Sequence, residues 1–133
     1  MADAVTSQTI QDGERVAVMK LTNVSDGTGE SAVKKVDVSA LTTNSAGESC
    51  TSGCVAIIYW ATRGMGVNIE FDATSNVLRT GLPADSTGDE YSDVLSALHT
   101  NAGSGVTGDI DFTTVGHSSG DTYSIILVLN KNY

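Results

Sequence analysis

The chain has 133 residues and a formal net charge of −9, from 16 Asp and Glu against 7 Lys and Arg. Basic residues this few and scattered argue against binding to nucleic acid or to an anionic membrane surface, because both need a clustered positive footprint. The length fits one domain, and the 16 Thr and 15 Ser beside only 17% charged residues favour strands over surface helices. The composition therefore predicts a single-domain, all-β protein.

The first 13 residues are polar, have no hydrophobic period and do not resemble a signal peptide. Their only sizeable aliphatic side chains are Val5 and Ile10, which contribute at most about 3–6 kcal/mol when buried. Ordering the backbone costs about 1–2 kcal/mol per residue. We therefore predict an extended N-terminal arm, residues 1–13, in front of a β-domain, residues 14–133. The arm is expected to order on a sister subunit or another protein, with Val5 and Ile10 as assembly contacts.

From residue 14 onward, short apolar segments alternate with turns rich in Gly, Ser and Asp, and they predict seven strands. Two of these segments are strongly apolar and are expected to be central strands, and the first segment is expected to be covered on both sides. The predicted fold is an antiparallel β-sandwich or a jelly-roll-like barrel. The predicted strands are 16–21, 33–40, 55–61, 65–71, 77–82, 109–115 and 122–129, of which 55–61 and 122–129 are central.

Two local patterns add detail to this fold. The segments 55–61 and 65–71 flank the short turn at Arg63 and Gly64, and they predict a hairpin. Between residues 85 and 108, Thr87–Glu90 fits a capping box. Apolar residues at helical spacing follow it, so a short helix stays open in this region. These apolar residues are Tyr91, Val94, Leu95 and Leu98.

The segment Gly116–Gly120 matches the G-x-S-x-G pattern of a nucleophile elbow. That elbow needs a helix after the serine and a His later in the chain. Here a predicted strand follows, and no His lies beyond His117. The segment is therefore interpreted as a hairpin loop.

Cys50 and Cys54 are separated by Thr-Ser-Gly. With His99 and His117 they could form a two-Cys, two-His zinc set, but zinc ligands usually come as closely spaced pairs and these His are 18 residues apart. We therefore expect no metal. The sequence leaves two redox states open: Cys50 and Cys54 are either free thiols or joined by a short local disulfide.

The acidic residues suggest no built site. The densest group lacks the D-x-[DN]-x-[DN]-G loop of calcium sites and is interpreted as solvated surface. Asp109 and Asp111 share one strand face, but strand alternation explains that spacing as well as a glycosidase carboxylate pair does. The chain is therefore predicted to be no enzyme and to need no cofactor. The densest group consists of Asp85, Asp89, Glu90 and Asp93.

Six short segments, grouped in an N-terminal and a C-terminal stretch of the chain, carry a resemblance. They resemble small virion proteins of tailed bacteriophages from aquatic environments, which include capsid decoration (cement) proteins and tail or fibre components. The resemblance covers about half the chain and includes no catalytic signature. The segments are Ser7–Ile10, Asp12–Arg15, Asn23–Gly29, Gly108–Ile110, Phe112–His117 and Gly120–Ile125.

This resemblance implies a non-enzymatic virion structural protein, made in the bacterial host cytoplasm and placed on the outer surface of the head. There it would stabilise the shell by bridging major capsid subunits, with the major capsid protein and copies of itself, expected as a trimer, as partners. The alternative is a tail, fibre or host-surface module that binds a receptor or glycan. A surface cluster of Tyr59, Trp60 and Tyr91 would favour that alternative, and an extended arm would favour cement.

Overall fold

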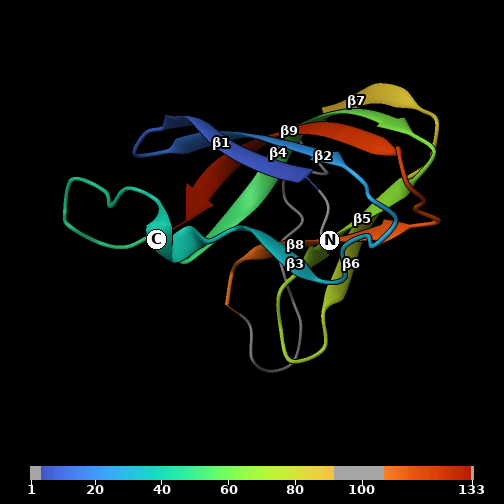
Figure 1. The fold of residues 1–133 in the computed structure, drawn as a ribbon. Coiled ribbons are helices and arrows are strands. Elements are labelled where there is room, and N and C mark those ends of the chain that lie inside the picture. Colours follow the sequence, from blue (N-terminus) through green and yellow to red (C-terminus); the bar gives the residue numbers. More distant parts are fainter. Residues whose placement is uncertain (1–3, 92–106, 133) are drawn as a thin grey trace.

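The computed structural model describes residues 4–91 and 107–132, and these residues form nine strands in two antiparallel sheets (Figure 1). The five-stranded sheet has the order β1-β2-β9-β4-β7, and the four-stranded sheet has the order β3-β8-β5-β6. A 3-10 turn, η1 (Val38–Ala40), follows β3. The strands are β1 (Ala4–Asp12), β2 (Val16–Val24), β3 (Val33–Val36), β4 (Ser52–Arg63), β5 (Gly66–Phe71), β6 (Val77–Leu82), β7 (Thr87–Tyr91), β8 (Ile110–Val115) and β9 (Thr122–Asn132).

Eight of these strands are paired as in a jelly roll. β5 pairs with β6, β4 with β7, β3 with β8 and β2 with β9, so the chain from β2 to β9 is one long hairpin wound into two layers. The pairs β4–β9 and β5–β8 complete the two sheets. The predicted all-β antiparallel fold is confirmed, and its connectivity is that of the jelly roll.

The two sheets enclose one apolar core. Side chains alternate between core and outer face along each strand, so that Ile125, Leu127 and Leu129 of β9 are completely buried. Phe112 of the four-stranded sheet meets Tyr123 of the five-stranded sheet edge to face, with ring centroids 5.8 Å apart. β9 lies between β2 and β4, and β4 lies between β9 and β7, so both segments predicted as central are central.

The N-terminal segment is a strand of the molecule's own sheet. β1 pairs with β2 along its length, with one register shift between Thr9 and Gln11. The expectation that the arm must order on another molecule is therefore corrected for residues 4–12, because backbone hydrogen bonds to β2 do the ordering that Val5 and Ile10 cannot. These two side chains are 40% and 53% exposed. The division into an arm, 1–13, and a β-domain, 14–133, stays a prediction.

The structure decides part of the region in which a helix was left open, and it corrects the predicted hairpin. Thr87–Tyr91 is strand β7, paired with β4, so the capping-box pattern does not begin a helix. Residues 92–106, which hold Val94, Leu95 and Leu98, lie outside the described residues. β4 and β5 belong to different sheets, so the turn at Arg63 and Gly64 is a corner between layers and not a hairpin.

The described residues contain no helix that is long and apolar enough to cross a membrane.

Candidate functional site

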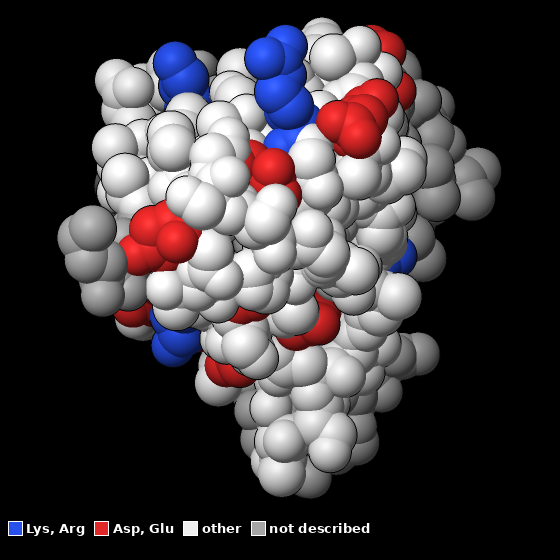
Figure 2. Space-filling view, turned by 45° about the vertical axis from the view of Figure 1, so that its right-hand side comes forward, with Lys and Arg blue, Asp and Glu red and all other residues white. Residues whose placement is uncertain are grey.

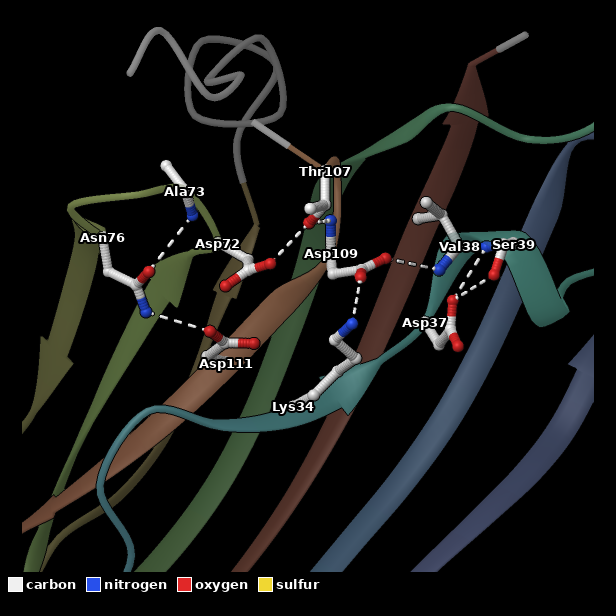
Figure 3. A network of polar contacts seen from close by, with 10 residues as sticks. All are labelled: Lys34, Asp37, Val38, Ser39, Asp72, Ala73, Asn76, Thr107, Asp109 and Asp111. Carbon is white, nitrogen blue, oxygen red and sulfur yellow. Dashed lines mark hydrogen bonds and ion pairs between the residues drawn. The ribbon is translucent and has the colours of Figure 1, made fainter. Parts of the chain in front are cut away.

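Three polar clusters with buried charged side chains, which we call centres, connect the strands and loops of the jelly roll. The first is a carboxylate cluster formed by Asp72, Asp109 and Asp111, where β5 ends and β8 begins (Figure 3). Asp109 and Asp111 are only 4% and 2% exposed. The sequence pattern indicates Asp109 and Asp111 as a pair, whereas Asp72 comes from a different loop and carries no such signal.

Each carboxylate of the cluster is already engaged inside the protein (Figure 3). Lys34 forms an ion pair with Asp109 at 2.8 Å, and the Val38 amide donates to the other oxygen of Asp109 at 2.9 Å. The Thr107 hydroxyl donates to Asp72 at 2.6 Å, and the Asn76 amide donates to Asp111 at 2.9 Å. The cluster therefore joins η1, β3 and the loops that flank β5 and β8.

The pKa values of the two neighbouring carboxyls Asp72 and Asp111 are shifted in opposite directions. Burial, and then the contact with Asp72, raise the pKa of Asp111 from its usual 3.8 to about 6. The Thr107 hydroxyl, and then Asp111 itself, lower the pKa of Asp72. Such a pair could in principle act as general acid and base. Surface pockets of about 420, 320 and 310 Å³ on the described part of the chain are lined by residues other than these carboxylates. The contacts of the cluster connect loops and strands inside the protein, which is a structural role.

The second centre is a buried ion pair between Glu30 and Lys35, whose side chains are 5% and 3% exposed. Glu30 also accepts hydrogen bonds from the Tyr123 hydroxyl at 2.6 Å and from the Asn23 amide at 3.0 Å. Its backbone exchanges hydrogen bonds with Thr114 on β8. The Glu30 carboxylate thereby links β2 and β9 of the five-stranded sheet to β3 of the other sheet, and the Glu30 backbone adds β8.

The third centre is the buried ammonium of Lys131 on β9, whose side chain is 0% exposed. It donates to the Asp12 carboxylate at 2.8 Å and to the carbonyls of Gly13 and Thr42 at 2.8 and 2.7 Å. Asp12 also accepts from the backbone and the hydroxyl of Thr42 at 2.8 and 2.9 Å. Burial raises the pKa of Asp12, but the hydrogen bonds from Lys131 and Thr42 outweigh it and hold that pKa below 3.8. Lys131 therefore fastens the C-terminal end of β1 to the body of the sandwich.

We expect Lys131→Met to lower the free energy of unfolding by about 2 kcal/mol, because it leaves Asp12 and two carbonyls without their shared donor. The end of β1 should also lose protection from hydrogen exchange before the rest of the five-stranded sheet does. Urea titration and amide exchange measure the two effects. Arg63→Met, at an exposed position, is the control and should change stability by less than about 0.5 kcal/mol. Equal stability of the two variants would contradict the anchoring role.

The loop Gly116–Gly120 connects β8 to β9 and therefore joins the two sheets, so its interpretation as a hairpin is wrong. The hydroxyl and amide of Ser118 both donate to Asp121, at 3.0 and 2.7 Å. His117 instead lies beside Thr114, with 3.1 Å between Nδ1 and Oγ1. Ser118 and His117 are thus each engaged elsewhere and do not form a nucleophile–base pair.

The cysteine and metal predictions are only partly covered by the described residues. Cys50 is buried at 3% exposure, whereas the side chain of Cys54 and all of His99 lie outside what the structure describes, so the disulfide between Cys50 and Cys54 stays a prediction. Within the described residues, no group of three or more His, Cys, Asp or Glu side chains is placed to hold a metal ion.

The two aromatic residues of β4 point to opposite faces. Tyr59 is 48% exposed on the outer face of the five-stranded sheet. Trp60 packs against the core and donates to the Ser86 hydroxyl at 3.0 Å. Gly88 supports the Trp60 ring, because a Cβ there would lie only 2.9 Å from it. Tyr59 and Trp60 therefore do not form one stacking platform.

Figure 2 shows one face of the molecule, on which Asp and Glu side chains and fewer Lys and Arg side chains lie as separate groups in a mostly uncharged surface. No family model, no curated protein and no solved structure matches the chain.

Proposed function

We propose that this chain is a non-enzymatic virion structural protein, and specifically a decoration protein on the outer surface of a tailed-phage head, where it bridges major capsid subunits. Its further partners are copies of itself, as trimers at threefold positions of the shell. The jelly roll is compatible with this role by analogy alone, because capsid proteins, lectins and cupins all use that architecture. The sequence resemblance supplies the link to virions.

The observation that carries the proposal is the free edge of β1. Among the residues that the structure describes, this nine-residue strand pairs on one side only, with β2, and it stands at the end of the five-stranded sheet. Ala4–Gln11 contains no charged residue and no Pro, and every side chain in that range is exposed. Natural edge strands usually carry charge or proline that prevents pairing with other chains. An unprotected edge is suited to adding a strand from a partner.

The buried centres support the same role mechanically. Lys131 holds the end of β1 to β9, and a partner strand added to β1 would therefore be connected to the centre of the sandwich. The aromatic arrangement gives the alternative, a glycan- or receptor-binding module, no specific support, because Tyr59 and Trp60 lie on opposite faces of β4.

The test uses heads of the phage that encodes this chain, prepared without the chain and then supplied with purified protein. We expect stoichiometric density on the outer shell in cryo-electron microscopy. We also expect the double variant Val5→Lys and Ile10→Lys to reduce occupancy at least about tenfold, because lysines on an edge strand oppose strand addition. Val24→Lys, at an equally exposed position on β2, is the matched control and should bind as the wild type does. Density on the tail alone, or equal binding of the double variant, would contradict the proposal.

A further inference from the structure

The five-stranded sheet is apolar on both sides, although the four-stranded sheet covers only one of them. On the side turned away from the core, which we call the outer face, Val18, Ile57, Ile126 and Val128 are half-buried and Tyr59 is 48% exposed. None of these five residues belongs to the core or packs against it. The outer face accounts for the sequence pattern of β2, β4 and β9, which have apolar side chains on both sides of the strand.

The outer face carries little of the chain's negative charge. Among the described outer positions of β1, β2, β9, β4 and β7, the charged residues are Lys20, Arg63 and Asp89. The chain as a whole has a net charge of −9, so this is a surface on which two copies can approach without strong repulsion.

The register places two of these charges in one cross-strand row, on either side of two apolar residues. Lys20 on β2 lies opposite Ile126 on β9, Ile126 opposite Tyr59 on β4, and Tyr59 opposite Asp89 on β7. From β2 to β7, the row therefore consists of a positive side chain, two apolar side chains and a negative side chain. In the adjacent outward row, Val18, Val128 and Ile57 pair in the same way. Neither Lys20 nor Asp89 forms an ion pair with another described residue.

We infer that the outer face binds the outer face of a second copy of this chain about a twofold axis. An axis parallel to the strands, between β9 and β4, reverses the row, so that Lys20 of one copy faces Asp89 of the other, twice per dimer. The same rotation sets Ile126 against Tyr59 and Val128 against Ile57. The row is thus complementary to itself, as an isologous interface requires. Aligned packing of this kind is common for two twisted sheets.

The size of the face is sufficient for a reversible contact. The axis between β9 and β4 leaves β1 without a facing strand, so the contact uses β2, β9, β4 and β7. At about 4.8 Å between strands and about 3.4 Å per residue, the facing parts of these four strands cover roughly 500 Å² on each copy. Two such faces bury about 1,000 Å², which is at the lower limit of specific interfaces and fits a reversible dimer. The contact is twofold and does not use β1's free edge, so it is separate from the attachment to heads proposed above.

The test is sedimentation equilibrium of the purified full chain in solution, without heads. We expect a reversible dimer. Lys20→Glu and Asp89→Lys should each weaken dimerisation at least about tenfold, because each places like charges opposite one another twice. The double variant, which exchanges the two charges, should recover wild-type affinity within about threefold. Arg63→Glu changes the net charge as Lys20→Glu does, but it would face Thr122 of the second copy and should have little effect.

A chain that stays monomeric at all concentrations would overturn the inference. So would an oligomer, of whatever size, that both single variants leave unchanged, or a double variant as weak as the singles. The outcome is independent of head binding, because the dimer is measured without heads and the β1 variants leave the outer-face row intact.

Discussion

Replacing Lys35 with Met is expected to lower the free energy of unfolding by about 3–5 kcal/mol, because it leaves the Glu30 carboxylate buried without its counter-ion. Glu30 and Lys35 are almost completely buried, and Glu30 touches both sheets through Asn23, Tyr123 and the Thr114 backbone. Loss of the Glu30–Lys35 ion pair is therefore expected to destabilise the whole sandwich cooperatively, and not one loop alone. Urea unfolding followed by the fluorescence of Trp60, the single tryptophan, measures it.

Adding Glu30→Gln to Lys35→Met should restore most of the lost stability. A neutral amide needs no counter-ion, and its oxygen still accepts from Tyr123 and Asn23. Arg63→Met again serves as the exposed control. A loss below about 1 kcal/mol for Lys35→Met, or a double variant no more stable than the single one, would show that the ion pair does not hold the two sheets together.

The second large effect concerns pH and the carboxyl pair of Asp72 and Asp111. The folded chain retains the proton of Asp111 up to about pH 6, whereas the unfolded chain releases it near the usual pKa of 3.8. The folded state therefore binds more protons between these values, and the contribution of Asp111 to the free energy of unfolding falls as pH rises from about 4 to about 6. The pKa difference corresponds to at most about 3 kcal/mol. Asp72, whose pKa is lowered, acts in the opposite sense, and its contribution is lost as the pH falls below 3.8.

Asp111→Asn should remove this dependence. The amide carries no charge, so the variant is expected to match the wild type near pH 4 and to be more stable than it near pH 7.5. Urea titrations at a series of pH values measure the difference. Asp85→Asn, which removes a carboxyl from the loop between β6 and β7, is the control and should not flatten the profile. A variant that is less stable than the wild type at pH 7.5 would show that the charged form of Asp111 is the favoured one.

The positions of most strands follow from local patterns. The segments 55–61 and 122–129 are apolar on both faces, and such strands belong at the centre of a sheet. One buried charge also left a signal in the sequence. Lys131 continues the inward alternation of Ile125, Leu127 and Leu129, so a lysine at this register position must find acceptors inside the protein.

Other features carry no such signal. Lys35 sits at a register shift of β3, where simple alternation does not tell which face a side chain takes. Thr87–Glu90 satisfies a helix-start pattern over four residues, yet pairing with β4 outweighs that weak local preference. Asp72 and Asp111 are far apart in the chain and meet only because β5 pairs with β8.

The sequence by itself determined that the protein is all-β, where the central strands lie and how polar its N-terminal segment is, because these properties depend on side-chain pattern within a few residues. Only the tertiary structure decided which strands share a sheet and that Ala4–Asp12 pairs with β2 of its own chain. It alone also placed Lys20 and Asp89 in one cross-strand row, on either side of Ile126 and Tyr59. Strand pairing is set by the burial of a common core and by hydrogen bonds between distant segments, and no local window of the sequence contains both partners.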